Sequence, residues 1–233
     1  LAGRAVSVTA ASRTDTGVHA RGMVAHVEVP KVEYRIEEGK LRAWGLSNET
    51  TYGLCQFHQA AVAMGAPLPA TVQNDFSLLD RSMEPELAEA IAPRHLNISF
   101  LVYGALNGGL LTGKYFEGEP KESRHNLWPN FQPRYHSDLS RRAARQYVTL
   151  AKEYGLTPVE LALGWTLSRE YVSSTIIGST KMDQLKTCLA TVGISISDEL
   201  NTAVDEIHKM FPNPNKSAGV ISPGFIKDVR KGI

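Results

Sequence analysis

The chain has 233 residues, of which 21% are charged, and its formal net charge is +1. This length suits one or two domains with a buried core, and the balanced charge gives no electrostatic preference for nucleic acid or a membrane surface. No apolar run approaches the roughly 20 residues that a membrane-spanning helix needs. Cys55 and Cys188 lack CxxC spacing, which predicts a reducing compartment rather than a disulfide framework.

From Leu41 onward, short apolar runs alternate with longer helical stretches. Gly65 and Gly155 are placed to end helices, and Thr157-Pro158-Val159-Glu160 has the pattern of a capping box that begins one. The patterning predicts strands at residues 41–46, 70–73, 98–103 and 172–177, and further helices at residues 50–64, 85–92, 137–154, 182–190 and 197–210.

Residues 107–132 break this pattern, because they are rich in Gly, Pro, Asn and aromatic residues. A long irregular stretch in a compact domain is typical of a functional lid or of a disordered segment. We expect Trp128 and Phe131 of this stretch to form one wall of a ligand pocket.

The order of these elements predicts the fold class. Strands that alternate with helices at roughly 30-residue spacing imply βαβ units and a parallel sheet. Four such units can be counted, whereas a closed (β/α)₈ barrel needs eight and about 250 residues. We therefore predict an α/β fold of the (β/α) TIM-barrel type that comprises only the second half of the barrel.

Polar or aromatic side chains follow each predicted strand, where the ligand chemistry of such folds collects. Ser47-Asn48 and Gln73-Asn74 carry hydroxyl and amide groups suited to a carboxamide, and the Tyr103 ring could stack on a flat heterocycle. Gly178-Ser179-Thr180 opens a helix, whose backbone N–H groups and dipole favour a phosphate. Together these four strand ends predict a dinucleotide stretched across the edge of the sheet.

Each strand end also has a purely structural interpretation. Ser47 and Asn48 could serve as a helix cap and nothing more, and Gln73 could be a turn residue. Tyr103 could lie in the core, and residues 178–180 could form an ordinary strand-to-helix turn. The four ends taken jointly favour the binding interpretation.

Four segments carry a more specific signal: GKLRAWGLSN (39–48), TVQNDFSLLDR (71–81), LVYGALNGGLLTGKY (101–115) and STIIGSTKMDQLKTCL (174–189). In their order and spacing they resemble consecutive parts of the aldo-keto reductase superfamily. The branch they most resemble includes bacterial aldo-keto reductases and potassium-channel β-subunits. This resemblance implies an oxidoreductase that transfers hydride between NADPH and a small carbonyl or aldehyde substrate.

The resemblance also implies which residues would bind NADP(H). Ser47, Asn48 and Gln73 would bind the nicotinamide carboxamide, and Tyr103 would stack on the nicotinamide ring. The pyrophosphate and ribose would be lined by Gly104, Leu106, Gly108, Leu110 and Lys114. The adenosine end and its 2′-phosphate would be received by Gly178, Ser179, Thr180 and Gln184. Where the family usually has Glu-Asn, this chain has Thr187-Cys188, which weakens the expected adenine contact.

The catalytic residues of the family are a separate matter. The resemblance implies a proton-donating tyrosine that is tuned by a lysine, an aspartate and a histidine on the first four β/α units. Nothing before Gly39 resembles those units, and Asp15, His19, Lys31 and Tyr34 lie outside the family's segments. We therefore expect a cofactor-binding half-site whose catalysis is impaired when this chain acts alone.

The first segment has a different pattern. Residues 11–29 read ASRTDTGVHARGMVAHVEV, and this string resembles the active-site segment of the tRNA pseudouridine synthases that act on the anticodon stem-loop. The resemblance implies that Asp15 would attack the target nucleoside and that Arg13 would help to flip it from the stack. The alternative is a glycine-containing hairpin turn with a solvent-facing charge.

These patterns divide the chain into three parts: a pseudouridine-synthase-like fragment (1–30), a junction (31–38) and an NADP-binding half-barrel (39–233). The abrupt junction is also compatible with a gene-model or splicing fusion. RNA is not expected as a partner, because no basic stripe is present to track phosphates. Alternative functions are a fragment of an RNA-modifying enzyme and a non-catalytic NADP-binding or interaction protein.

Three further expectations follow. Unpaired edges of a half-barrel predict self-association into a homo-oligomer. The seven histidines show no metal-ligand spacing, so no metal is expected. The composition predicts a cytoplasmic protein, and an organelle stays open because the sequence begins with Leu1 and upstream residues could be missing.

Overall fold

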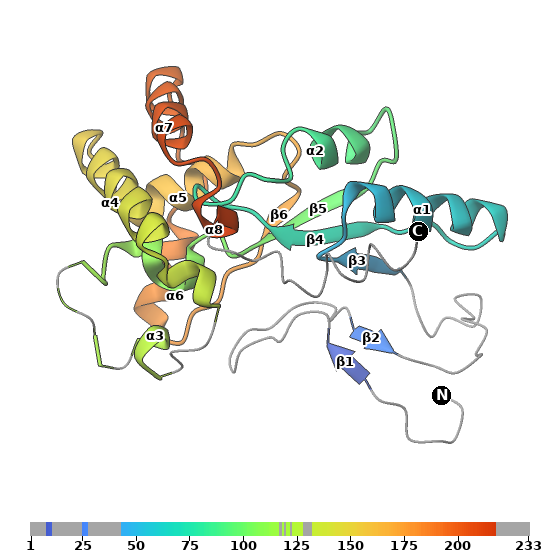
Figure 1. Ribbon diagram of the computed structural model, residues 1–233, viewed down its shortest axis with the longest axis horizontal. Coiled ribbons are helices and arrows are strands. Elements are labelled where there is room, and N and C mark those ends of the chain that lie inside the picture. Colours follow the sequence, from blue (N-terminus) through green and yellow to red (C-terminus); the bar gives the residue numbers. More distant parts are fainter. Residues whose placement is uncertain are drawn as a thin grey trace.

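The computed structural model describes residues 8–10, 25–27, 43–116, 118, 120–121, 123–127 and 132–217. Its larger sheet consists of parallel strands that follow one another in chain order: β3 (Gly45–Ser47), β4 (Thr71–Asp75), β5 (Ser99–Tyr103) and β6 (Ser174–Thr175) (Figure 1). Helices connect successive strands, so the predicted α/β fold with a parallel sheet is confirmed. The half-barrel stays a prediction.

Two helices connect the first three strands of this sheet. Helix α1 (Thr51–Ala63) follows β3 and helix α2 (Glu86–Ile91) follows β4, and both lie along the same side of the sheet (Figure 1). The N-cap of α1 is Thr50, whose side-chain oxygen accepts a hydrogen bond from the Gly53 N–H at 3.0 Å. Ser47 and Asn48 are therefore not the cap of this helix, and their side chains are available for another role.

The connection from β5 to β6 is longer and contains more helix than predicted. It comprises η2 (Asn107–Thr112), α3 (Arg124–Leu127), η3 (Pro133–His136), α4 (Asp138–Glu153) and α5 (Pro158–Leu167). The irregular stretch predicted at 107–132 thus holds η2 and α3. Gly108 and Gly109 have φ values of 63° and 95° inside η2, and this left-handed backbone hides the helical turns from a pattern search at a period of 3.6. Trp128 and Phe131, the predicted pocket wall, lie outside the described residues.

Side-chain caps define where the long helices begin. The Ser137 side chain accepts a hydrogen bond from the Ser140 N–H at 3.0 Å and begins α4. Thr157 and Glu160 form the predicted capping box of α5, with bonds of 3.2 Å and 2.7 Å. The buried face of α4 shows helical spacing and consists of Ser140, Ala143, Ala144, Tyr147, Leu150 and Ala151.

The C-terminal part adds α6 (Met182–Leu189), α7 (Asp198–Met210) and a short α8 (Pro214–Ser217). The Ser197 side chain accepts a hydrogen bond from the Leu200 N–H at 3.2 Å and begins α7, which agrees with the helix predicted at 197–210. Pro214 is the first residue of α8, since proline suits the first helical position. The Asn215 side-chain oxygen accepts a 3.0 Å hydrogen bond from Ser140, which attaches α8 to α4.

Aromatic residues connect the sheet to the helices. Phe76, directly after β4, stacks on Trp165 of α5 with ring centroids 5.4 Å apart. The guanidinium groups of Arg81 and Arg169 lie 5.0 Å and 4.9 Å from the Trp165 ring centroid, and the indole N–H donates to Asn201 of α7. This core joins β4, α5 and α7 into one packed unit.

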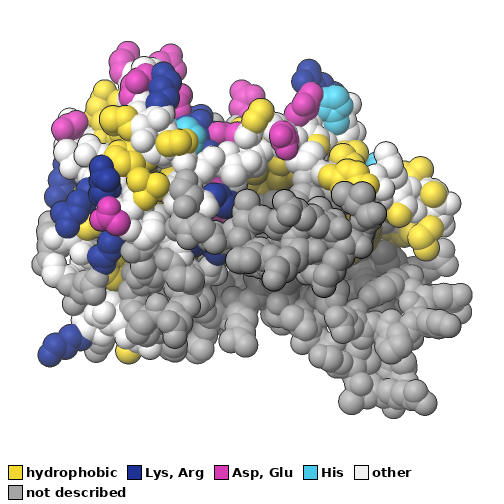
Figure 2. Space-filling model, in the orientation of Figure 1, with side chains coloured by type: hydrophobic (Ala, Val, Ile, Leu, Met, Phe, Trp, Pro, Cys, Tyr) yellow, Lys and Arg dark blue, Asp and Glu magenta, His cyan; other side chains and the backbone are white. Residues whose placement is uncertain are grey.

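The surface has a basic region and an apolar region. Figure 2 shows Lys and Arg side chains gathered over α4, and apolar side chains at the far end of α1. Leu54 and Ala61 of α1 are buried, whereas Phe57 and Met64 at the same helix are 46% and 80% exposed. In the described part of the chain, no helix has the length and apolar character to cross a membrane.

A separate pair of short strands precedes this sheet. Strand β1 (Val8–Ala10) pairs with β2 (Ala25–Val27) in antiparallel fashion, with Thr9 opposite His26. Residues 11–24, which include Arg13, Asp15 and His19, lie outside the described residues, and so does the predicted junction at 31–38. The proposed domain boundaries at 30 and 39 therefore stay predictions.

Candidate functional site

The carboxyl ends of β3, β4 and β5 bring the first predicted site residues together. Ser47 lies opposite Gln73 in the β3–β4 register, and the Asn48 backbone N–H donates a hydrogen bond to the Gln73 carbonyl at 2.8 Å. Tyr103 ends β5 in register with Asp75 at the end of β4. Because parallel strands end at the same edge, residues that are far apart in sequence meet there.

Side-chain hydrogen bonds unite three of these residues. The Tyr103 hydroxyl donates to Asn48 Oδ1 at 2.5 Å, and Asn48 Nδ2 donates to Ser47 Oγ at 3.2 Å. Asn48 has a φ of 56°, a conformation that asparagine adopts more readily than most residues, and it is exposed. Burial and the nearby Asp75 carboxylate raise the pKa of Tyr103 to about 12, so its hydroxyl stays protonated at neutral pH.

Directly next to Tyr103 lies a charged cluster that the sequence did not reveal. The Asp75 side chain is 5% exposed, and its Oδ2 accepts from Arg134 Nη2 at 2.7 Å and from the Tyr135 hydroxyl at 3.1 Å. Arg134 and Tyr135 belong to η3, about 60 residues further along the chain. The only sequence signal is an acidic residue at the end of an otherwise buried strand.

The ionisation of this cluster follows from its burial. Burial and the neighbouring Asp80 carboxylate raise the pKa of Asp75, while Arg134 and the Tyr135 hydroxyl oppose that rise. Burial lowers the pKa of Arg134, but interactions with Tyr135 and Asp75 outweigh it, so the net shift is upward. Arg134 therefore stays charged, and the Asp75 carboxylate depends on it as a counter-ion.

A glycine-rich turn follows β5 at the same edge. Gly104 and Gly108 have φ values of 76° and 63°, which favour glycine, and the space that a Cβ of Gly104 would take is filled by Asp75 Oδ1. Leu106 is half-buried against the core, whereas Leu110 has no exposed surface at all. The Lys114 ammonium group lies 5.0 Å from the centroid of the Tyr115 ring. Of the five residues predicted to line the pyrophosphate and ribose, Leu110 alone is inaccessible to a ligand.

The fourth predicted strand end opens α6. Gly178, Thr180 and Gln184 are exposed and Ser179 is half-buried. The Thr180 N–H and hydroxyl both donate to Gln184 Oε1, at 3.1 Å and 3.3 Å. This side chain therefore occupies part of the N-terminus of α6, where a phosphate would bind.

The two residues that depart from the family pattern lie on α6. The Thr187 hydroxyl donates to the Asp183 carbonyl of its own helix, and Cys188 is buried in the core. Neither side chain reaches from the helix toward a ligand in the way that the expected glutamate and asparagine would.

The comparison with known proteins decides the family. A sequence model described as the Aldo/keto reductase family matches residues 29–209, which is more than half of the chain. The chain belongs to the aldo/keto reductase family. The match begins at residue 29, so it does not include the segment around Asp15, and nothing in it supports a pseudouridine synthase.

Individual relatives agree with this assignment. Protein tas of Escherichia coli (strain K12) is 35% identical over 177 residues, which are 76% of this chain and 50% of that protein. An aldo-keto reductase of Babesia bovis is 35% identical over 77% of this chain and 65% of its own length. A putative voltage-gated potassium channel subunit beta of Schizosaccharomyces pombe is 30% identical over 76% of this chain and 53% of its own length. The chain thus spans about half to two thirds of the length of these relatives.

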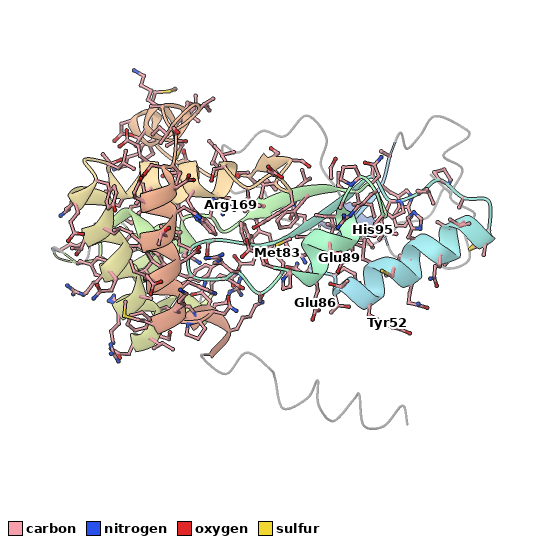
Figure 3. All side chains as sticks on the ribbon, turned by 90° about the horizontal axis from the view of Figure 1, so that it is seen from above. Tyr52, Met83, Glu86, Glu89, His95 and Arg169 are labelled. Atoms are coloured by element: carbon pink, nitrogen blue, oxygen red, sulfur yellow. The ribbon has the colours of Figure 1, made fainter. Side chains whose placement is uncertain are left out.

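A groove elsewhere on this aldo/keto reductase family chain is distinct from the strand ends. It lies between α1 and α2, has a volume of about 420 Å³, and shares no residue with the predicted cofactor contacts. Glu86 and Glu89 of α2 and the nearby His95 line it, beside α1 (Figure 3). Among the described residues, no group of three or more His, Cys, Asp or Glu side chains could hold a metal ion.

Proposed function

We propose that the chain binds NADP(H) across the carboxyl ends of its parallel strands, as part of an aldo-keto reductase. The reaction would be hydride transfer between NADPH and a small carbonyl or aldehyde substrate. The observation that carries this proposal is the hydrogen-bonded group of Ser47, Asn48 and Tyr103, beside Gln73, at adjacent strand ends.

The nicotinamide end of the cofactor fits the chemistry of these groups. A carboxamide needs both hydrogen-bond donors and acceptors, and the Ser47 hydroxyl with the Asn48 and Gln73 amides supplies both kinds. The Tyr103 ring is half-buried and would stack on nicotinamide, since offset stacking of flat rings is favourable.

The phosphate and adenosine ends of the cofactor fit the structure less completely than the nicotinamide end does. The glycine turn of Gly104 and Gly108 and the exposed Lys114 would accompany the pyrophosphate and ribose. Gly178, Ser179 and Thr180 at the start of α6 would receive the 2′-phosphate if Gln184 moved from the Thr180 N–H. Leu106 and Leu110 would act mainly through packing, because Leu110 is fully buried.

Hydride transfer also needs a proton donor near the carbonyl. No residue of the predicted site fills that role, so we expect residues 1–233 to reduce an aldehyde slowly when tested alone. Two functions would then remain for this chain: an impaired reductase and a non-catalytic NADP-binding or interaction protein.

The deciding experiment is a thermal melt of the purified chain with NADPH, NADH or neither. A cooperative transition whose Tm rises with NADPH concentration supports the proposal, because a ligand of the native state stabilises it by mass action. A larger rise with NADPH than with NADH supports a 2′-phosphate site. A transition that moves with neither cofactor contradicts cofactor binding. Oxidation of NADPH in the presence of an aldehyde then separates the reductase from the binding protein.

Self-association is proposed for the same chain. In the described sheet β3 and β6 are the outer strands, and Tyr52, Val62 and Met64 of α1 and its C-cap are 74%, 60% and 80% exposed. Exposed strand edges and apolar patches both favour association. Sedimentation equilibrium that shows only monomer would contradict this proposal.

The pseudouridine synthase resemblance around Asp15 stays a prediction. Release of tritium from [5-³H]uridine in an anticodon stem-loop RNA measures such activity, and Asp15→Asn is its control. We expect no release, because the resemblance covers only a short segment and the family match over residues 29–209 does not include it.

A further inference from the structure

Asp75 is a buried carboxylate at the edge of the sheet that takes no part in the proposed cofactor contacts. Arg134 and Tyr135 bond its Oδ2, while no described residue donates a hydrogen bond to its Oδ1. A buried ion pair is often no more stabilising than apolar side chains of the same volume. The position of this pair beside the strand ends therefore points to a role in ligand binding rather than in stability alone.

The carboxylate packs against the backbone that carries the Tyr103 ring. Asp75 and Tyr103 are register partners, and the Phe76 N–H donates to the Tyr103 carbonyl at 3.2 Å. Gly104 then turns the chain with a φ of 76°, and a Cβ atom at this residue would clash with Asp75 Oδ1 and lie 3.0 Å from the Tyr135 hydroxyl. The cluster thus fills the space directly beneath the turn after Tyr103.

The far end of the Tyr103 ring is held as well. Its hydroxyl donates to Asn48 Oδ1 at 2.5 Å. The positive charge of Arg134 opposes the rise in the Tyr103 pKa that burial causes. Tyr103 is therefore held through the turn at Gly104, which packs against Asp75, and through its hydroxyl, which donates to Asn48.

We propose that Asp75, paired with Arg134 and Tyr135, is a positioning residue that sets the Tyr103–Gly104 platform on which the nicotinamide ring stacks. The inference rests on the proposed function, and it assigns to η3 a role at the nicotinamide end only. It follows that loss of the Asp75 charge weakens contacts of the nicotinamide ring and leaves those of the adenosine end unchanged.

Two ligands separate these effects. NADPH reaches both ends of the proposed site, whereas adenosine 2′,5′-bisphosphate carries the adenosine and 2′-phosphate without a nicotinamide. We would measure the dissociation constants of both by isothermal titration calorimetry, for the wild-type chain, Asp75→Asn and Tyr135→Phe. The emission of bound NADPH reports the surroundings of its nicotinamide ring.

Two matched variants control for loss of stability. Tyr147→Phe also removes a buried tyrosine hydroxyl, on the core face of α4, and Asp205→Asn removes the carboxylate of another Arg–Asp pair, with Arg81 at 2.6 Å. Tyr147 belongs to α4 and Asp205 to α7, whereas Asn48 and Tyr103 lie at the ends of β3 and β5, so both controls should bind the two ligands as the wild type does.

We expect Asp75→Asn to bind NADPH about tenfold more weakly, with altered nicotinamide emission, and to bind the bisphosphate within about twofold of wild type. Tyr135→Phe removes the hydroxyl that donates to Asp75 Oδ2 and accepts from Arg134 Nη2. This variant should weaken NADPH binding about threefold, and it provides a second measurement if Asp75→Asn does not fold. Unchanged NADPH binding in the folded variants, or equal weakening of both ligands, overturns the positioning role. A wild-type chain that binds neither ligand overturns the proposed function, and with it this inference.

Discussion

The two ends of the proposed cofactor site are built differently. At the ends of β3, β4 and β5, side chains of separate strands bond one another, and the buried pair of Asp75 and Arg134 lies beneath them. At the start of α6, exposed side chains and backbone N–H groups dominate, and the Thr180 N–H and hydroxyl donate to Gln184 of the same helix. The first end is organised by packing across the sheet, and the second by a local helix turn.

This difference affects what each end can contribute to binding. A group that is already held in place loses little conformational freedom when a ligand arrives, so the nicotinamide end is preorganised. The adenosine end must exchange the Gln184 contact for a phosphate contact, and its affinity will depend more strongly on salt. Changes at the first end should therefore affect stability and binding together, and changes at the second should affect binding alone.

The largest effect is expected for Arg134→Met. This variant leaves Asp75 as an uncompensated buried charge, which costs about 3–5 kcal/mol of the free energy of unfolding. Urea denaturation followed by circular dichroism measures the change. The matched control is Arg142→Met, whose exposed pair with Asp138 at 4.0 Å should contribute only about 0–1 kcal/mol. If Arg134→Met and Arg142→Met lose the same free energy of unfolding, the buried pair of Asp75 and Arg134 is not a special feature of the nicotinamide end.

Gly104→Ala should have the next largest effect. Gly65 and Gly104 both have positive φ values, 63° and 76°, so alanine at either position costs about 1–2 kcal/mol of backbone strain. A Cβ at Gly65 meets nothing within 4 Å, whereas one at Gly104 would clash with Asp75. We therefore expect Gly104→Ala to lose a further 1–3 kcal/mol, roughly the cost of overpacking. If both alanine variants melt at the same temperature, the contact between Asp75 and the Gly104 turn is looser than the structure describes.

Gln184→Glu tests the other end. A carboxylate near the start of α6 can still accept from the Thr180 N–H and is favoured by the helix dipole, so the Tm should stay the same or rise slightly. The same negative charge repels a 2′-phosphate and should weaken NADPH binding about tenfold, with a smaller effect on NADH. A fall in NADH and NADPH affinity by equal factors would argue against a 2′-phosphate at this helix.

The smallest effect is expected for His208→Gln, remote from both ends. Burial and the positive charge of Arg81 lower the pKa of His208 in the folded chain below its ordinary value of 6.5, while Asp205 opposes the shift. The unfolded chain therefore takes up this proton more readily as the pH falls from 7.5 to 5.5, and stability is lost in that window. The variant should reduce the fall in Tm over this range by about 1–2 °C. An identical fall in both proteins would contradict a buried neutral His208.

Local signals in the sequence predicted most of the regular structure. Thr157 caps a helix as predicted, and the helices predicted to begin at residues 137 and 197 are capped by Ser137 and Ser197, because a cap depends only on residues three positions apart. The parallel order of the strands followed from their spacing. The 3-10 turns of η2 were missed, since two glycines with positive φ interrupt their period, and α8 was missed because it packs on distant residues.

The candidate site also has one part that local sequence signals predicted and another part that they did not. Ser47, Asn48, Gln73 and Tyr103 could be predicted because each lies at or near the carboxyl end of a strand, and parallel strands end at one edge. The partners of Asp75 could not be predicted, because Arg134 lies in η3 and no periodic pattern connects the two residues. A contact across a long crossover depends on how the crossover packs, and that information is spread over many residues.

The order of the strands also has a consequence for synthesis on the ribosome. β4 and β5 each pair with the strand made just before, but β6 begins at Ser174, about 70 residues after β5 ends at Tyr103. At roughly 5–20 residues per second, the outer edge of β5 waits several seconds for its partner. During that time Phe100 and Val102, which become fully buried, lack helix α5, which later packs against this sheet. The nascent chain is thus most vulnerable to aggregation between the emergence of β5 and that of β6.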